Sequence, residues 1–475
     1  MSAVHASPYS GSWYPRDAGG LQRLLAGCWE RSARRTGPLP GGALGYVVPH
    51  AGPQYSGAVA ASVYRSIEIQ QPDRIVVLAF PHRGGLQGVA APDAAAISTP
   101  LGTIALDAGF LSAFPRVPEE RVCDHSFEIQ LPFLQKAAPH ARVSVLYVGR
   151  LSGDGRRAAA AQLAEAARAG AVLVASSDFT HYGPSFGFLP FPLDRDTARR
   201  LRELDAECAS ASGSGDAALF LDTLEETGAT VCGSGPIGLM LETLRLIAGD
   251  DLYQVQLDYE TSGEIAGDYR DSVSYAALGY FRREAFRVSS AEGETLLALA
   301  SEALQNLRET GDRASHPAAA PLSPTLQMRR GAFVTLSLGD ELLGCVGNVT
   351  GCRPLSEEIV DLTLSAALDD PRFRPAAEVE GPIDIEISVL TPLRRIRDAA
   401  EIKIGCHGVF LRVGGHSGLL LPQVATEHGW NAEEFLRALS RKSLTAPHSW
   451  RDPRARLYVF EAQILKMGAG GQGAG

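Results

Sequence analysis

Through the first part of the chain, short runs of apolar, β-forming residues alternate with longer stretches whose apolar residues recur at helical spacing. Five runs are predicted to be buried strands, at 45–49, 74–80, 142–149, 171–176 and 275–281. Helical stretches are predicted at 57–67, 158–170 and 235–249. Because strands and helices alternate, we predict an α/β domain with a largely parallel sheet.

A different pattern begins near residue 289. Ser289 and Glu292 have the spacing of a capping box, and the residues that follow place apolar side chains on one face of a predicted helix. Beyond it, runs at 331–338, 383–390 and 408–413 alternate as antiparallel strands do, and 356–370 and 431–442 are predicted helices. We therefore predict a separate α+β domain over 289–465, after a first domain over 6–283.

Two segments have the composition of irregular chain. Residues 314–325 contain Pro317, Pro321 and Pro324, which do not fit a helix interior, and we predict an extended connector there. Residues 466–475 are rich in glycine and have little apolar surface to bury. We predict that they form a disordered tail.

Composition limits the class of protein. The net charge of -10 argues against partners that favour a basic surface, so we expect no nucleic-acid and no membrane partner. No apolar run approaches the roughly 18 residues of a membrane span, and the first 20 residues lack the apolar core of a secretion signal. The seven cysteines are odd in number, widely spaced and never in a C-x-x-C pair. We expect a cytoplasmic protein in a reduced compartment.

Chemically capable residues recur at one kind of position. His50, His82 and His181 stand just past predicted strands, and Cys232 lies among glycines at the start of a predicted helix. Each alone could be a turn residue or a buried small side chain. Strands of a parallel sheet end side by side, so together they predict a site. We expect the helix amino terminus to lower the pKa of the Cys232 thiol.

If these strand ends converge, His50, His82 and Cys232 form a nitrogen and sulfur donor set. Such a set suits iron, copper or zinc rather than magnesium or calcium, and three protein ligands leave an open position. His181 would then be free to transfer protons, with Asp178 close enough in sequence to orient it.

A further pair, His125 and Glu128, lies three residues apart at a predicted helix start and shares a face. One interpretation is a helix cap and a solvated face. The other is that both support metal-bound histidines from the second shell, as carboxylates commonly do.

The motifs "SGSWYP", "VVPHAG", "HSFEIQLPFLQ", "SSDFTHYG" and "CGSGPIG" resemble those of the Memo-like family, AmmeMemoRadiSam system protein B. That family is similar in fold to the class III extradiol dioxygenases, whose site holds non-haem iron. The resemblance implies that His50, His82 and Cys232 bind the metal and that His181 and Asp178 line the pocket. The chain departs from the family at Pro53 and in "FPHRGG", which affects the expected shape of the substrate pocket.

The later pieces, among them "LLGCVGNV", "GCHGVFLRVGG" and "LLLPQVATEHGW", resemble the AMMECR family, AmmeMemoRadiSam system protein A. Leu343 stands where that family has an arginine, which removes a bidentate donor for an anion. Cys345 and Cys352 could be a reactive pair or two buried structural cysteines. The fusion implies a separate radical S-adenosylmethionine protein as partner, because this chain lacks the three-cysteine cluster motif of such a protein.

Three functions remain open at this point. The leading hypothesis is a metal-dependent oxidoreductase, dioxygenase-like, that uses one iron or copper ion in preference to zinc and acts on an unidentified small molecule. The second is a metal-binding or scaffold protein without catalysis. The third is a hydrolase in which Cys232, His181 and Asp178 form a nucleophilic triad.

Overall fold

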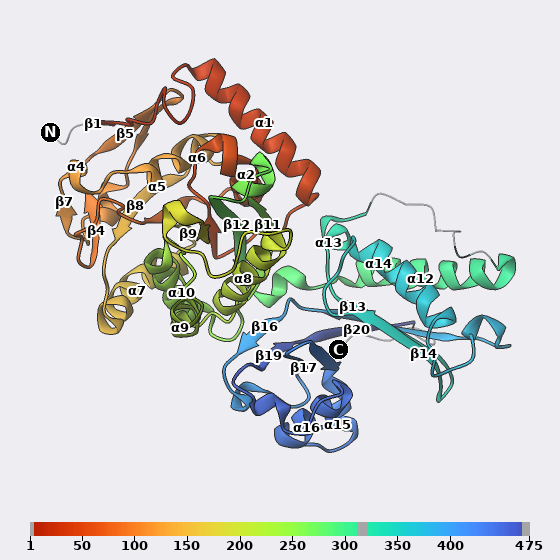
Figure 1. Cartoon of the computed structure of the whole chain (residues 1–475). Coiled ribbons are helices and arrows are strands. Elements are labelled where there is room, and N and C mark those ends of the chain that lie inside the picture. Colours follow the sequence, from red (N-terminus) through yellow and green to blue (C-terminus); the bar gives the residue numbers. More distant parts are fainter. Residues whose placement is uncertain (1–3, 312, 314–321, 468–475) are drawn as a thin grey trace. The chain divides into compact units, whose positions relative to one another are not determined.

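The computed structural model describes residues 4–311, 313 and 322–467 (Figure 1). The chain divides into two compact units, one up to Ala285 and one from Phe286. Most of the predicted connector, 314–321, lies outside the described residues, and its end already belongs to helix α13 (Pro324–Gln327). The predicted tail lies outside them at 468–475, whereas Lys466 still ends a strand.

The first unit is built on a mixed nine-stranded sheet with a parallel centre and a further parallel pair, β4 and β7, at one edge. The order of the main path is β10-β12-β2-β9-β3-β8-β4-β7, with β11 also paired to β12. The four central strands are parallel, whereas β12 runs antiparallel to β2 and β4 runs antiparallel to β8. The strands are β2 (Gly45–Val48), β3 (Arg74–Ala79), β4 (Val89–Pro92), β7 (Arg116–Val117), β8 (Arg142–Val148), β9 (Val172–Ser176), β10 (His181–Tyr182), β11 (Tyr253–Thr261) and β12 (Ser272–Phe281).

Helices cover both faces of this sheet (Figure 1). α1, α2 and α6 pack together over one face, and α7, α9 and α10 pack together over the other. The central strands are buried almost throughout, as expected for strands covered on both sides. The helices are α1 (Ala18–Thr36), α2 (Pro53–Gln70), α3 (Ala108–Leu111), α4 (Glu119–Val122), α5 (His125–Glu128), α6 (Gln130–Ala137), α7 (Gly153–Arg168), α8 (Thr197–Ser212), α9 (Ala217–Thr227), α10 (Ser234–Ala248) and α11 (Ser262–Ala266).

A small second sheet holds the N-terminal strand against the first unit. Its order is β1-β5-β6, with β1 (Val4–Ala6) parallel to β5 (Ala96–Thr99) and β6 (Gly102–Ala105) antiparallel to β5. β1 is therefore an edge strand of three residues. The pairing brings the start of the chain beside residues that lie more than a hundred positions later, including Glu128.

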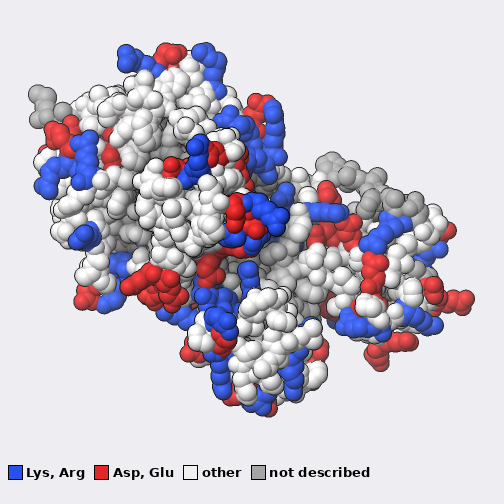
Figure 2. Space-filling model, viewed as in Figure 1, with Lys and Arg blue, Asp and Glu red and all other residues white. Residues whose placement is uncertain are grey.

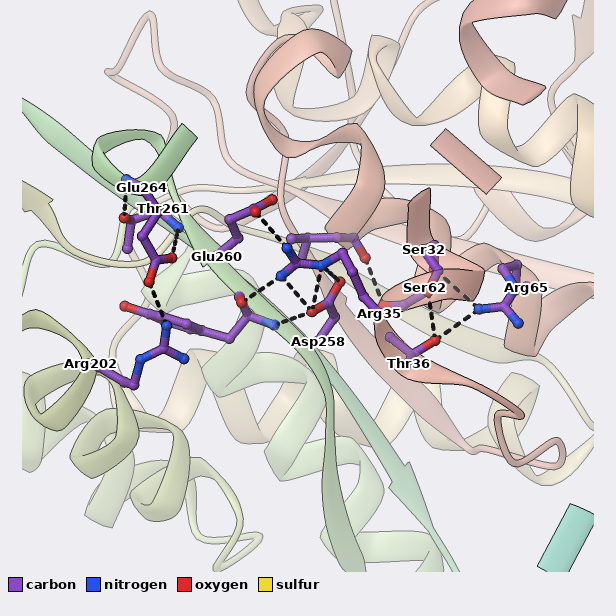
Figure 3. Close-up of polar contacts among 12 residues, drawn as sticks. Ser32, Arg35, Thr36, Ser62, Arg65, Arg202, Asp258, Glu260, Thr261 and Glu264 are labelled. Atoms are coloured by element: carbon purple, nitrogen blue, oxygen red, sulfur yellow. Dashed lines mark hydrogen bonds and ion pairs between the residues drawn. The ribbon is translucent and has the colours of Figure 1, made fainter. Parts of the chain in front are cut away.

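Hydrogen bonds and ion pairs link the C-terminal end of α1 to β11 (Figure 3). Arg35 donates from Nε and Nη2 to the Asp258 carboxylate at 3.0 and 2.9 Å, and Nη2 also donates to the Tyr259 carbonyl at 2.9 Å. Nη1 pairs with Glu260. A planar guanidinium serves all of these acceptors at once, which a lysine ammonium does not.

We expect Arg35→Lys to lower the free energy of unfolding of the chain by about 1–2 kcal/mol, because charge-assisted hydrogen bonds to a largely buried carboxylate are lost. Arg34→Lys is the matched control. Arg34 pairs only with Glu30, both more than half exposed, so its change should stay below about 0.5 kcal/mol. Urea unfolding of both variants measures the difference, and equal effects would contradict the role given to Arg35.

The second unit contains two four-stranded antiparallel sheets, of order β14-β13-β15-β20 and β16-β19-β17-β18. The predicted capping box at Ser289 and Glu292 is confirmed and begins the first helix. The strands are β13 (Ala332–Leu338), β14 (Glu341–Asn348), β15 (Asp384–Leu390), β16 (Arg394–Ile396), β17 (Gly408–Val413), β18 (His416–Leu420), β19 (Arg456–Phe460) and β20 (Ala462–Lys466). The longer helices are α12 (Ser290–Thr310), α14 (Leu355–Leu368), α15 (Pro422–Glu427) and α16 (Ala432–Lys442).

Basic and acidic side chains are interspersed on the face of each unit drawn in Figure 2. Among the described residues, none of the helices has both the length and the apolar character needed to cross a bilayer.

Candidate metal centre

Three imidazole rings meet at the carboxyl edge of the central strands. His50 follows β2, His82 follows β3, and His125 is the first residue of α5. The ring centroids of His50 and His82 are 5.0 Å apart, those of His50 and His125 5.2 Å, and those of His82 and His125 4.1 Å. One nitrogen from each ring lies within 4.8 Å of the others. The three side chains can therefore share one metal ion.

The hydrogen bonds of His50 fix which nitrogen is free. Its Nδ1 lies 3.0 Å from the Ser176 hydroxyl, whose own proton is donated to the Ser126 carbonyl. The Ser176 oxygen must therefore accept from the imidazole, so His50 carries its proton on Nδ1. The unprotonated Nε2 faces the Cys232 sulfur at 3.3 Å. This is the nitrogen that a metal ion would use.

His82 has the same arrangement. Its Nδ1 lies 3.2 Å from Oδ2 of Asp124, which also accepts the His82 backbone N–H at 2.7 Å. A carboxylate accepts only, so Nδ1 donates to it, and in the neutral ring the lone pair lies on Nε2. Although burial raises the pKa of Asp124, the hydrogen bonds from His82 and Ser126 outweigh it and lower that pKa overall. Carboxylates in this position orient metal-bound histidines and increase their basicity.

Cys232 lies at the same edge, just before the helix α10. Its sulfur is within hydrogen-bond distance of His50 Nε2, of the Ser177 hydroxyl at 3.9 Å and of the Asp178 carbonyl at 3.6 Å. The expectation that the helix amino terminus lowers the thiol pKa is wrong. Burial and the charge of the Asp178 carboxylate raise the pKa of Cys232 to about 12. Without a cation beside it, this thiol keeps its proton.

His181 and Asp178 lie on the segment that follows β9. His181 Nδ1 is 3.0 Å from the Thr230 carbonyl oxygen, so it donates there, and in the neutral ring the lone pair lies on Nε2. The Asp178 carboxylate is buried and accepts the His50 backbone N–H at 2.8 Å. Burial raises the pKa of Asp178 to about 6, despite that hydrogen bond. Asp178 therefore holds the His50 backbone in place, while His181 presents a free nitrogen.

His125 and Glu128 share α5 but have different partners. His125 packs against the two other histidine rings and also against Trp13 and Tyr9, with centroids 4.9 and 6.1 Å away. Glu128 is buried and contacts His5 instead. Sequence reasoning assigned no role to Trp13 or Tyr9, although Trp13 lies within the quoted "SGSWYP" motif and Tyr9 directly precedes it. Sequence reasoning also missed the hydrogen-bond acceptors that orient each histidine ring, because these acceptors come from distant segments.

Two imidazoles of the cluster, His50 and His125, have lowered pKa values. Burial lowers the pKa of His50 well below its usual value, and the imidazoles of its neighbours lower it further. Burial and the charge of His82 lower the pKa of His125 to about 4. At neutral pH His50 and His125 are therefore neutral, and a neutral imidazole offers a metal ion a lone pair in place of a proton.

A pocket of about 470 Å³ opens near His181. It is lined by the aromatic residues Tyr55, Phe186 and Tyr275 and by polar residues of α11 and the segment before β12. The Phe186 ring lies 5.2 Å from the His181 ring, centroid to centroid. Phe186 therefore links the wall of this pocket to His181, which does not itself line the pocket.

In the second unit, the interpretation of Cys345 and Cys352 as a buried pair is wrong, because Cys352 is exposed and Cys345 only half-buried. Cys345 accepts a hydrogen bond from the Thr335 hydroxyl at 3.3 Å. Leu343, at the position of the expected arginine, is buried in the core.

Comparisons with known proteins match both parts of the chain. The family model described as Memo-like protein matches residues 6–279, and the model described as AMMECR1 matches residues 297–465. Protein MK0488 of Methanopyrus kandleri is 41% identical over 37% of this chain and 88% of its own length. Protein PH0010 of Pyrococcus horikoshii is 36% identical over 38% and 92%. The crystal structure of PH0010 covers 37% of this chain and 92% of its own, with a TM-score of 0.35.

Proposed function

The chain belongs to the Memo-like family, with an AMMECR1 segment after the Memo-like one in the sequence, and from this premise we propose that its first unit is a metal-dependent oxidoreductase acting on a small organic molecule. The family alone does not decide the reaction. The proposal rests on the side chains at the edge of the sheet.

We propose His50 Nε2, His82 Nε2 and the Cys232 sulfur as the metal ligands, with His125 close enough to add a fourth nitrogen. The observation that carries this assignment is the hydrogen-bond acceptor beside Nδ1 of each of the two strand-end imidazoles. Both have their Nδ1 fixed as donors, to Ser176 and to Asp124, so that both Nε2 lone pairs are available. Nitrogen with sulfur suits iron or copper, and zinc as the third choice.

A bound iron or copper ion would supply electron-transfer chemistry and an open coordination position. Side chains of the protein would transfer protons, position the ligands and orient the substrate. His181 Nε2 takes a proton from the substrate or returns it, because its Nδ1 is already held by Thr230. Asp178 keeps the His50 backbone in register, and the aromatic walls of the pocket orient an organic substrate and exclude water.

The dioxygenase-like form of this proposal rests on the motif resemblance to proteins similar to the class III extradiol enzymes. The same resemblance leads us to propose a cytoplasmic location and a separate radical S-adenosylmethionine protein as partner. A gene for such a protein beside this one would support the partnership.

The metal assignment is tested by purification without oxygen, followed by elemental analysis. We expect about one equivalent of iron or copper per chain, and His50→Ala should reduce it at least tenfold, because a fixed ligand is removed. The matched control is His140→Ala, an exposed histidine of the same unit. Absence of stoichiometric iron or copper in the parent chain, or its retention in His50→Ala, would contradict the proposal.

The remaining alternatives make different demands. A hydrolase needs a reactive thiolate, yet the Cys232 thiol has a raised pKa, and its imidazole neighbour is His50 rather than His181. We therefore do not propose one. A scaffold protein would bind the metal yet show neither oxygen uptake nor redox cycling with any small molecule that fits the pocket.

A further inference from the structure

A second cluster of side chains that could bind a metal ion lies in the same unit. It contains His5 from β1, Cys123 from the segment after α4, and Glu128 from the end of α5. One ligand atom from each lies within 4.8 Å of the others. Cys123 and Glu128 are buried and His5 is half-buried, so the cluster is set inside the unit rather than on its surface.

The cluster leaves buried acceptors unsatisfied. Glu128 is fully buried, and its Oε1 lies 3.1 Å from His5 Nε2, yet its Oε2 has no hydrogen-bond partner among the residues that the structure describes. Oε2 of Glu119, also buried at that atom, has none either. A buried carboxylate oxygen without a donor costs folding free energy, and native structures satisfy such groups or place an ion beside them.

We propose that His5, Cys123 and Glu128 bind a second metal ion, zinc, at a site separate from the histidine centre. Imidazole nitrogen, thiolate and carboxylate are the three donor types that zinc accepts in tetrahedral sites. On binding, the Cys123 thiol releases its proton to solvent as the sulfur joins the metal. The charges of one thiolate and one carboxylate then balance the two charges of the ion.

The surroundings of His5 fit a metal ligand. Its two nitrogens face two different carboxylates, Nε2 toward Glu128 and Nδ1 toward Glu119 at 3.5 Å. With the metal beside Nε2, the Nδ1 proton is donated to Glu119. This is the carboxylate, histidine and metal arrangement that orients ligands in zinc sites.

The competing explanation is an ion pair without metal. In it His5 is doubly protonated and bridges Glu119 and Glu128. That explanation accounts for the two contacts of His5. It leaves the second oxygen of Glu128 without a partner among the described residues, whereas a metal ion would bind that carboxylate together with the adjacent Cys123 sulfur, which the Tyr147 hydroxyl also contacts.

The second site would act on the first through a shared segment. His125 and Glu128 are the first and last residues of the same four-residue helix, and Cys123 is followed by Asp124, which orients His82. Zinc at the second site would therefore hold this segment, and through it the histidine centre. The zinc site nevertheless requires no redox chemistry at that centre.

The test counts zinc in the full chain after chelation, zinc addition and gel filtration. Because zinc can also enter the histidine centre, His50→Ala is the background. We expect one equivalent in His50→Ala and less than a tenth of that after adding Cys123→Ser or, separately, His5→Gln. Cys28→Ser, a buried cysteine outside both clusters, is the matched control and should keep the equivalent. Zinc should also raise the thermal midpoint of His50→Ala but not of His50→Ala with His5→Gln.

His5→Gln serves as the second variant because His5 is half-buried and its replacement can still donate a hydrogen bond to Glu128. Zinc absent from His50→Ala, or retained after Cys123→Ser or His5→Gln, would overturn the site and leave the ion pair as the explanation. That result would not touch the proposed oxidoreductase, which stands or falls on the iron or copper of the parent chain.

Discussion

Replacing Gly233 by alanine is expected to lower the free energy of unfolding by about 3 kcal/mol, with metal binding at the histidine centre weakened roughly 10- to 100-fold. A Cβ at this position would lie 2.4 Å from the Ser177 Cβ and 2.6 Å from the Ser176 carbonyl oxygen. Neither can yield, because Ser176 is in β9 and Ser177 accepts the Gly233 N–H at 2.8 Å. The start of α10 must move, and Cys232 moves with it.

The control lies two residues away. A Cβ at Gly235 would meet its nearest neighbour at 3.6 Å, an ordinary contact, so Gly235→Ala should change stability by less than about 0.5 kcal/mol. Urea unfolding and metal titration of both variants separate the local clash from the general effect of a side chain in this turn. Similar behaviour of the two variants would contradict the close approach of Cys232 to β9.

Asp205→Ala is expected to cost about 3 kcal/mol or more. Asp205 is buried in α8 and accepts hydrogen bonds from the Thr180 N–H at 3.2 Å, the Thr180 hydroxyl at 2.6 Å and the Tyr259 hydroxyl at 2.7 Å. Alanine leaves these buried donors without their acceptor. Thr180 lies between Asp178 and His181, so the loss should also disorder the segment that carries them. Chemical unfolding measures the first effect, and proton resonances of His181 report the second.

Asp205→Asn should cost about 1 kcal/mol or less at neutral pH. The amide oxygen still accepts from Thr180, and the Tyr259 hydroxyl can accept from the amide while donating to Ser274, 3.3 Å away.

Burial raises the pKa of Asp205, with its hydrogen bonds opposing this only in part. The folded chain thus keeps this proton to higher pH than the unfolded chain does. Stability of the parent chain falls as pH rises from about 4 through that pKa, and Asp205→Asn lacks this loss. Over that interval the free energy of unfolding of Asp205→Asn should therefore rise relative to that of the parent chain. A fall relative to the parent would contradict the role given to burial.

The central strands were predictable because they are covered on both faces and therefore read as short apolar runs between helices. The prediction of a largely parallel sheet was correct for β2, β9, β3 and β8 and for the short edge pair β4 and β7, but not for the pairings of β10, β11 and β12 or for that of β4 with β8. The antiparallel strand β12 pairs with β2, although more than two hundred residues separate them. Apolar runs do not reveal direction, which depends on the path of the intervening chain.

The candidate site could be predicted where a residue follows a strand and, for Cys232, where a thiol stands among glycines at a helix start. His50 and His82 carry that signal, and they lie together in the structure. His125 begins a short helix, and its sequence position favoured a cap or supporting role as much as a place among the rings. Its position is set by packing against Trp13 and the other histidines, which come from distant segments.

The error on the Cys232 pKa has a physical cause of the same kind. The sequence shows the helix that follows the thiol, and a helix amino terminus favours a thiolate. The sequence does not show that the sulfur is enclosed, nor that the Asp178 carboxylate lies beside it. Burial and a nearby negative charge both oppose ionisation, and together they exceed the contribution of the helix.

The edge strand β1 has a consequence for how an ion could reach the inner cluster. β1 pairs along one side only, through three residues, so it can detach locally at a far lower free-energy cost than unfolding the nine-stranded sheet. Detachment would withdraw His5 and uncover the Glu128 carboxylate, which opens a path for ion entry and exit. The exchange rate of an ion at that cluster would then follow the fraying of the N-terminal strand, while the centre at the sheet edge exchanges independently.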